Sequence, residues 1–289
     1  MSIDVASVRA DTPGCQNVLH LNNAGASLPP AIVLERVKAH LDLEAEIGGY
    51  EAADRTADEY ERIYASIARM LGSKPEEIAL VESATCAWDA AFSALAEQFQ
   101  PGDRILTAAN EYVSNYLAFL QTARRRGIQI EVVPSETSGE ISLRALEAAI
   151  ERHGRRVRLI ALTHVPTNGG LVQPAAAVGR IARRNSIPFL LDACQSVGQL
   201  PLRVEDLGCD ILSATGRKYL RAPRGTGFLY VRQSLLEQLE PLSLDMRSAE
   251  WTARDQYKIR KDARRFETWE SSVACRLGLG VAVEYALVI

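Results

Sequence analysis

The chain has 289 residues, of which 47% are hydrophobic and 24% are charged, and its formal net charge is −3. This is the composition of an ordinary globular protein, and so small a charge gives no field that would attract nucleic acid or an anionic membrane. Five scattered cysteines without a CxxC pair argue against disulfides and against a zinc site. The sequence shows no signal peptide and no apolar run of membrane-spanning length, so we expect a cytoplasmic protein.

Helical and strand patterns alternate along most of the chain. The first long helix opens at Pro29-Pro30, since proline is favoured in a first turn, and it places Val33, Val37 and Leu41 on one face. A second helix is predicted over 53–71. Strands are then expected at 78–81, 104–108, 129–133, 158–163, 188–191, 211–214 and 227–231, with further helices at 85–99, 113–126, 143–153, 174–185 and 272–289.

The strand at 188–191 is apolar on consecutive residues, which indicates that both of its faces are covered. Strands of this kind that alternate with helices predict an α/β fold of the doubly wound class, with a mainly parallel sheet and helices on both sides. The final helix ends on Leu287-Val288-Ile289 without a cap or a polar tail. Natural termini usually fray into polar residues, so the chain resembles one that is cut within an element.

Polar residues follow several of the predicted strands, and in a parallel sheet such positions converge at one edge, where ligands bind. They are Thr85, Tyr112, Thr163-His164, Asp192 and Lys218. Each residue also has an ordinary structural interpretation. Asp192 and Thr85 could cap helices, Tyr112 could belong to the core, and Lys218 could lie in a surface loop. An aspartate that leaves a doubly buried strand nevertheless needs a cation nearby. A lysine behind such a strand can act as an amine nucleophile.

The motifs of nucleotide-binding and zinc-protease sites are absent from the sequence. There is no GxGxxG after a strand, no GxxxxGK[ST] and no HExxH. A nucleotide-dependent oxidoreductase therefore has only the fold class in its favour, and fold does not imply function.

The sequence resembles the class V aminotransferases, which include cysteine desulfurases, selenocysteine lyases and isopenicillin-N-epimerase-like proteins. The matching motifs are HLNNAGASLPP at 20–30, Asp192-x-x-Gln195, Thr215-x-x-Lys218, RGTGFLYV at 224–231 and RFETWESSVACRLGLGVAVEYA at 265–286. The resemblance implies the type I fold of pyridoxal-5′-phosphate (PLP) enzymes, with a large domain over 21–289 and a seven-stranded-type sheet. Residues 1–20 would form an N-terminal arm, and the family's C-terminal small domain is expected to be missing.

The resemblance also implies a role for each matching residue. Lys218 would be the catalytic lysine that forms the Schiff base, Asp192 would hold the pyridine nitrogen, and Gln195 would approach the ring hydroxyl. Tyr112 would stack on the ring where desulfurases place a histidine. Thr167 or Asn168, of which we prefer Asn168, would make a further ring contact. The phosphate would be held by Ala84 through its N–H, Thr85, Thr215 and Arg217, and Asn23 and Ala24 would line the substrate side.

The function that follows from the resemblance is a PLP-dependent reaction on a small amino acid in a homodimer, as a desulfurase-like lyase or as a transaminase. Two departures favour an alternative, a shortened or inactive relative that folds and dimerises without turnover. Trp269-Glu270-Ser271-Ser272 replaces the family's G-T-P-N, which in relatives touches the phosphate of the neighbouring subunit. The missing domain would carry the catalytic cysteine and a carboxylate-binding arginine. Cys194 and Cys275 are interpreted as packing cysteines.

Overall fold

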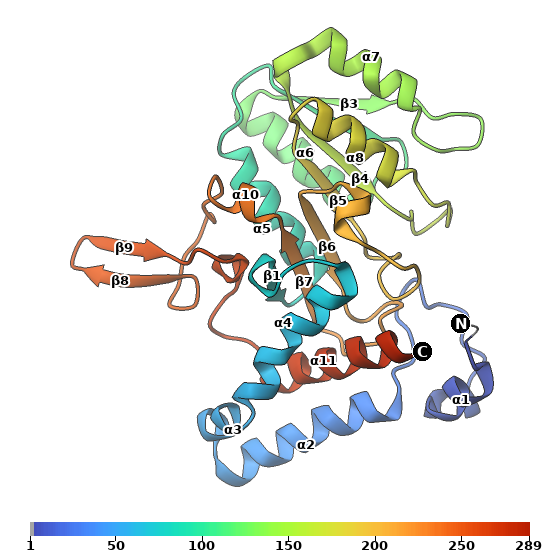
Figure 1. Ribbon diagram of the computed structural model, residues 1–289, viewed down its shortest axis with the longest axis vertical. Helices are drawn as coiled ribbons and strands as arrows, with labels where there is room; N and C mark the ends of the chain where they lie inside the picture. The colour runs from blue at the N-terminus through green and yellow to red at the C-terminus, as the bar shows by residue number, and fades with distance from the viewer. Residues whose placement is uncertain (1–2) are drawn as a thin grey trace.

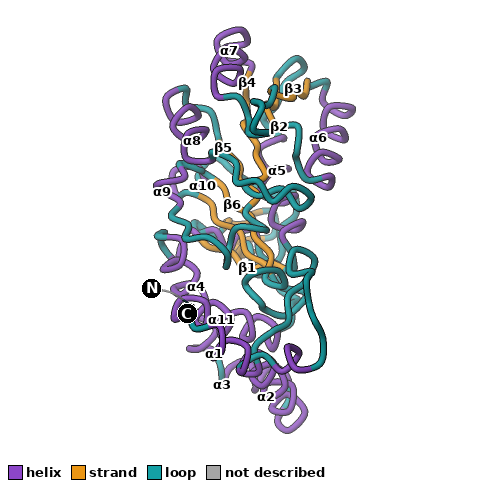
Figure 2. Tube along the Cα trace, turned by 90° about the vertical axis from the view of Figure 1, so that its right-hand side faces the viewer, coloured by secondary structure: helices purple, strands orange, loops and turns teal. Residues whose placement is uncertain are grey.

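A computed structural model describes residues 3–289 and consists of one seven-stranded sheet between two layers of helices (Figures 1 and 2). The α/β class with a mainly parallel sheet, predicted from the sequence, is confirmed. The strands of this sheet are β1 (Ile78–Val81), β2 (Arg104–Ala108), β3 (Gln129–Val133), β4 (Val157–Thr163), β5 (Phe189–Asp192), β6 (Ile211–Thr215) and β7 (Gly227–Val231). The helices are α1 (Val5–Ala10), α2 (Ala31–Ile47), α3 (Gly49–Arg55), α4 (Ala57–Leu71), α5 (Ala84–Ala96), α6 (Val113–Arg126), α7 (Leu143–His153), α8 (Ala175–Arg184), α9 (Val204–Leu207), α10 (Gln233–Leu236) and α11 (Val273–Val288).

The strand order is β1-β7-β6-β5-β4-β2-β3, and β7 alone runs in the direction opposite to the other six strands. Since β1 and β6 both pair antiparallel with β7, they run in the same direction as each other and as the other strands. The carboxyl ends of β1, β2, β4, β5 and β6 therefore meet at one edge of the sheet, together with the amino end of β7. The sequence predicts this convergence, and it determines where a ligand can bind.

The two faces of the sheet bury separate apolar clusters. Alternate residues of β1 point to opposite faces, with Leu80 in one cluster and Ala79 in the other. Helices α4, α7, α8, α9 and α11 pack on the first face, and α5, α6 and α10 pack on the second. Figure 2 shows the sheet edge-on, with α8 and α9 on one side and α6 on the other.

Three features differ from the sequence-based expectation or were not predicted. The helix expected over 53–71 is divided at Thr56, whose hydroxyl donates to the carbonyls of Ala52 and Ala53 and so competes with the helical ladder. A hairpin of β8 (Ala249–Ala253) and β9 (Gln256–Ile259) projects from the body of the molecule (Figure 1). The short helix α1 lies in the N-terminal segment.

Within residues 3–289, no helix has the length and apolar character required to span a bilayer.

Candidate active site

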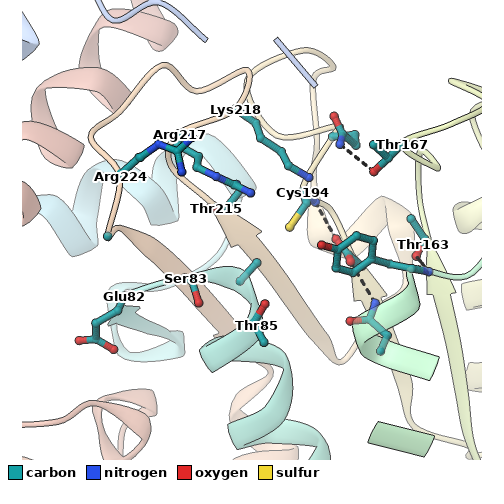
Figure 3. A pocket seen from close by; sticks show the side chains of 16 residues that line it. Glu82, Ser83, Thr85, Thr163, Thr167, Cys194, Thr215, Arg217, Lys218 and Arg224 are labelled. Carbon is teal, nitrogen blue, oxygen red and sulfur yellow. Dashed lines mark hydrogen bonds between the residues drawn. The ribbon is translucent and has the colours of Figure 1, made fainter. Parts of the chain in front are cut away.

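A cavity of about 210 Å³ opens at the edge of the sheet where the carboxyl ends of five strands meet (Figure 3). Ten of the residues singled out from the sequence line it, and they come from segments up to 134 positions apart (84 to 218). The wall is made of Glu82, Ser83, Ala84, Thr85, Tyr112, Asn115, Thr163, Thr167, Asp192, Cys194, Gln195, Thr215, Arg217, Lys218, Arg224 and Gly225.

Lys218 lies in the loop between β6 and β7, and its side chain reaches into the cavity (Figure 3). The loop is fixed directly before the lysine, because Gly216 N–H donates to Thr226 O at 2.9 Å and Ser27 N–H donates to Arg217 O at 2.9 Å. The side-chain Nζ lies 5.8 Å from the centroid of the Tyr112 ring. Among residues 3–289 no carboxylate forms an ion pair with Lys218, although only 6% of the residue is exposed. The amine is therefore buried and available to a ligand.

Asp192 is the last residue of β5, and it is 4% exposed. Its Oδ1 accepts the Cys194 N–H at 2.9 Å and its Oδ2 accepts the Asn115 Nδ2 at 3.0 Å. Both donors are neutral, and within the described chain no cationic side chain pairs with this carboxylate. A buried anion without a counter-charge is costly, so the site favours a ligand that brings a positive charge.

The amino terminus of α5 forms an anion-binding end of the cavity. The first N–H groups of a helix have no intrahelical acceptor, and the helix dipole places partial positive charge there. Ser83 caps the helix by accepting the Cys86 N–H at 3.2 Å, which leaves Ala84 and Thr85 at the wall of the cavity. Strand β7 passes so close that a Cβ atom at Gly227 would lie 2.8 Å from the carbonyl carbon of Ser83, and only glycine fits.

Two arginines complete the anion-binding end. Arg217 and Arg224 both line the cavity, and Figure 3 shows their side chains on the same side of it as Ser83. Neither is in an ion pair within the part of the chain that is described. The nearby acid Glu82 is held instead by Arg276, whose Nη2 lies 3.1 Å from its Oε1. Two guanidinium groups without a counter-ion favour a ligand with more than one negative charge.

The side-chain amide of Gln195 is a further polar group in the wall of the cavity. Its Nε2 donates to Ala24 O at 3.1 Å and to Thr167 Oγ1 at 3.0 Å, whereas its buried Oε1 has no partner. The bond to Thr167 draws that residue to the wall, so Thr167 and not the preferred Asn168 lines the cavity. Asn23 lines a second cavity beside Tyr219 and the N-terminal segment.

Comparison with known proteins gives the family. The family model described as "Aminotransferase class-V" matches residues 18–288. The chain belongs to the class V aminotransferase family. It is 26% identical over 281 residues to a probable cysteine desulfurase of Pyrococcus abyssi, and the match covers 96% of this chain and 69% of that protein.

Solved structures of class V relatives superpose closely on the fold. The apo cysteine desulfurase of Thermococcus onnurineus matches with a TM-score of 0.90 at 26% identity, over 100% of this chain and 72% of that one. The cystine C–S lyase C-DES, in complex with its product cysteine persulfide, matches with a TM-score of 0.86 at 25% identity, over 96% and 74% of the two chains. A C-DES mutant with glycine covalently linked to its PLP cofactor matches at 0.87 and 25% identity, over 96% and 73%.

The residues of the cavity fit the cofactor of the class V enzymes, PLP, at each of its polar ends. An unpaired amine suits the aldehyde, an unpaired carboxylate suits a protonated ring nitrogen, and the α5 terminus with its two arginines suits a phosphate. The unpartnered Oε1 of Gln195 is free to accept a hydrogen bond from the ring hydroxyl. One cavity therefore offers a group suited to each polar end of the cofactor.

Several residues of the site were not assigned to it from the sequence. Cys194 was interpreted as a packing cysteine, but it lines the cavity, and burial together with the adjacent Asp192 raises the pKa of its thiol. Glu82, Ser83 and Asn115 were given no role, and Arg224 was noted only as the first residue of the RGTGFLYV motif. Conversely, His164 follows β4 yet does not line the cavity: its Nδ1 lies 3.0 Å from Ser196 Oγ, and burial lowers its pKa to about 4.

Proposed function

We propose that this class V enzyme holds PLP in the cavity at the carboxyl edge of the sheet and cleaves the C–S bond of a cysteine-type amino acid. The observation that carries the proposal is the presence of both Lys218 and Asp192 in one cavity. A buried amine and a buried carboxylate, neither neutralised by the described chain, line one cavity that also ends in an anion-binding helix terminus. When bound, PLP supplies an electrophilic carbon and a cationic ring that accepts electrons from the substrate Cα.

We propose that the polar groups around Asp192 orient the ring. The Asp192 carboxylate, with two neutral donors behind it, would keep a proton on the ring nitrogen. Gln195 would accept from the ring hydroxyl through Oε1 and remain fixed through Nε2 by Ala24 and Thr167. Tyr112, whose ring lies beside Lys218 Nζ, would cover one face of the ring.

The phosphate would be held by the N–H groups of Ala84 and Thr85, by the hydroxyls of Thr85 and Thr215, and by Arg217. We add Arg224 to these residues, since it lines the same end of the cavity. Such an arrangement binds a dianion through helix dipole and charge together, so it would retain the cofactor while the amine of Lys218 is released.

Lys218 would then act as the acid–base group of the reaction. With a substrate amino acid bound in the cavity, the Lys218 amine would be placed to take the proton from the substrate Cα. Loss of that proton allows the sulfur to leave from Cβ, and this lyase reaction requires no protein thiol. The similarity to C-DES, a cystine C–S lyase, supports this reaction.

We also propose a cytoplasmic homodimer in which residues 1–20 act as an arm on the PLP domain. An exposed apolar stripe supports a partner surface next to the site. It is made of Val113, Leu117 and Leu120, which lie on one face of α6 and are 64%, 59% and 48% exposed.

The product mixture tests the proposed reaction. We expect the PLP-saturated protein to convert cysteine into pyruvate, ammonia and sulfide, and cystine into pyruvate, ammonia and cysteine persulfide. Elimination removes the Cα proton and the Cβ sulfur, and water then releases the amino group as ammonia. The measurement is sulfide, pyruvate and alanine after incubation with cysteine, cystine and alanine. Alanine as the carbon product of cysteine would indicate a desulfurase, and keto acid formed from alanine would indicate a transaminase. If the protein binds PLP but forms none of these products, the proposed catalytic activity is wrong.

A further inference from the structure

Glu111 lies behind the cavity and receives four hydrogen-bond donors from three elements. Its carboxylate accepts from Thr107 Oγ1 at 2.9 Å, from the Tyr112 N–H at 2.8 Å and from Asn115 Nδ2 at 2.9 Å, and also from the Thr163 hydroxyl. Thr107 belongs to β2, Thr163 ends β4, and Asn115 lies in the first turn of α6. The proposed chemistry gives this carboxylate no role, since Glu111 does not line the cavity.

Asn115 connects Glu111 to the ring-binding carboxylate. The same Nδ2 that donates to Glu111 Oε1 also donates to Asp192 Oδ2 at 3.0 Å, and Asn115 is only 3% exposed. Only the amino end of the amide can face two carboxylates, so Glu111 fixes which way the Asn115 side chain points. Without Glu111 the amide could rotate and turn its oxygen toward Asp192.

Glu111 is connected to Tyr112 as well. The Tyr112 N–H donates to Glu111 Oε1 and also to Thr163 Oγ1 at 3.1 Å, which fixes the residue at the start of α6. One carboxylate thus holds the backbone of the aromatic residue and, through Asn115, the orientation of Asp192. These are the two residues that would contact the face and the nitrogen of the ring.

We propose that Glu111 is a positioning residue for the cofactor ring, acting on Asp192 through Asn115 and on Tyr112 through its backbone. The inference rests on the proposed function, since it assumes that a ring nitrogen faces Asp192. A carboxylate is required here because four donors converge on it, and a glutamine would present its own amino group to some of them. Burial raises the pKa of Glu111, and the hydrogen bonds from Thr163, Asn115 and the Tyr112 N–H oppose this rise only in part.

The test uses Glu111→Gln, Asn115→Ala and the double variant. We expect each single change to weaken PLP affinity by about tenfold, the factor that corresponds to one charge-assisted hydrogen bond. The visible circular dichroism of the bound cofactor should change as well, because the ring is held differently. The double variant should bind PLP no more weakly than the worse single variant, since both changes break the same connection. The measurements are PLP titration of the apoprotein and the dichroism spectrum.

Glu131→Gln is the matched control. Glu131 lies on β3, does not line the cavity, and is a partly buried carboxylate paired with Arg104, Arg152 and His153. Its replacement should therefore leave PLP affinity unchanged. The melting temperature of each apoprotein separates positioning from folding. A Glu111→Gln protein that melts earlier but keeps the wild-type affinity and dichroism would overturn the proposal.

Two further outcomes are decisive. If the fold-losses of PLP affinity in the two single variants multiply in the double variant, Glu111 does not act through Asn115. That result also overturns the proposal. If Glu111→Gln does not fold, Asn115→Ala alone decides, since an unchanged dichroism spectrum would mean that the amide does not orient the ring. Wild-type protein that takes up no PLP would instead refute the proposed function, which distinguishes the two failures.

Discussion

Replacement of Lys218 by alanine should abolish turnover, with a loss of at least about a thousandfold, because in the proposed reaction one amine would both attach the cofactor and move the substrate proton. The anion-binding end of the cavity is untouched by this change, so the variant should still bind PLP, but in a form that is removed by desalting. The absorbance spectrum after desalting and the rate of pyruvate formation measure the two effects.

Lys258→Ala serves as the control for Lys218. Lys258 lies on the exposed strand β9 and does not line the cavity, so its loss should change neither spectrum nor rate. Cofactor absorbance that survives desalting in Lys218→Ala would mean that another group carries the cofactor.

Replacement of Asp192 by asparagine should reduce turnover by about a hundredfold to a thousandfold while PLP affinity falls much less. The physical reason is that an amide keeps the shape of the carboxylate but removes the buried negative charge, and breaking a buried charge pair costs about 3–5 kcal/mol. Without that charge the ring nitrogen loses its proton and the ring accepts electrons poorly. The measurement compares the rate of pyruvate formation with the PLP dissociation constant of each variant.

Asp210→Asn is the matched control for this charge. Asp210 precedes β6 at the opposite edge of the sheet, where it accepts the Phe189 N–H at 3.0 Å and pairs with Arg232. Its replacement can lower stability but should leave the activity of the folded protein unchanged. Asp192→Asn protein with the wild-type rate would show that no cationic ring faces this carboxylate.

The sequence predicted the fold well because each element depends on local patterns. Consecutive apolar residues in β5 and the prolines before α2 are such signals, and the structure agrees with both. The break at Thr56 was missed because it depends on one hydroxyl that competes with the helical ladder. The hairpin of β8 and β9 was missed because its strands are exposed and have no buried face that would create an alternating pattern.

The candidate site was predictable where a residue directly follows a strand or belongs to a family motif. Asp192, Thr215 and Lys218 are of this kind. Glu111 and Asn115 were not identified because their importance arises only when β2, β4, β5 and α6 meet in space. The sequence also could not indicate that Thr167 lines the cavity in place of Asn168. The hydrogen bond from Gln195 that holds Thr167 there joins residues 28 positions apart in the sequence.

Borohydride reduction of the PLP-loaded protein, followed by proteolysis and mass measurement of the peptides, identifies the residue that holds the cofactor. Reduction fixes the cofactor to the amine that holds it, so the added mass should be found on the peptide containing Lys218 and on no other lysine. Cofactor mass on a different residue, or on none after full loading, would show that Lys218 does not hold the cofactor.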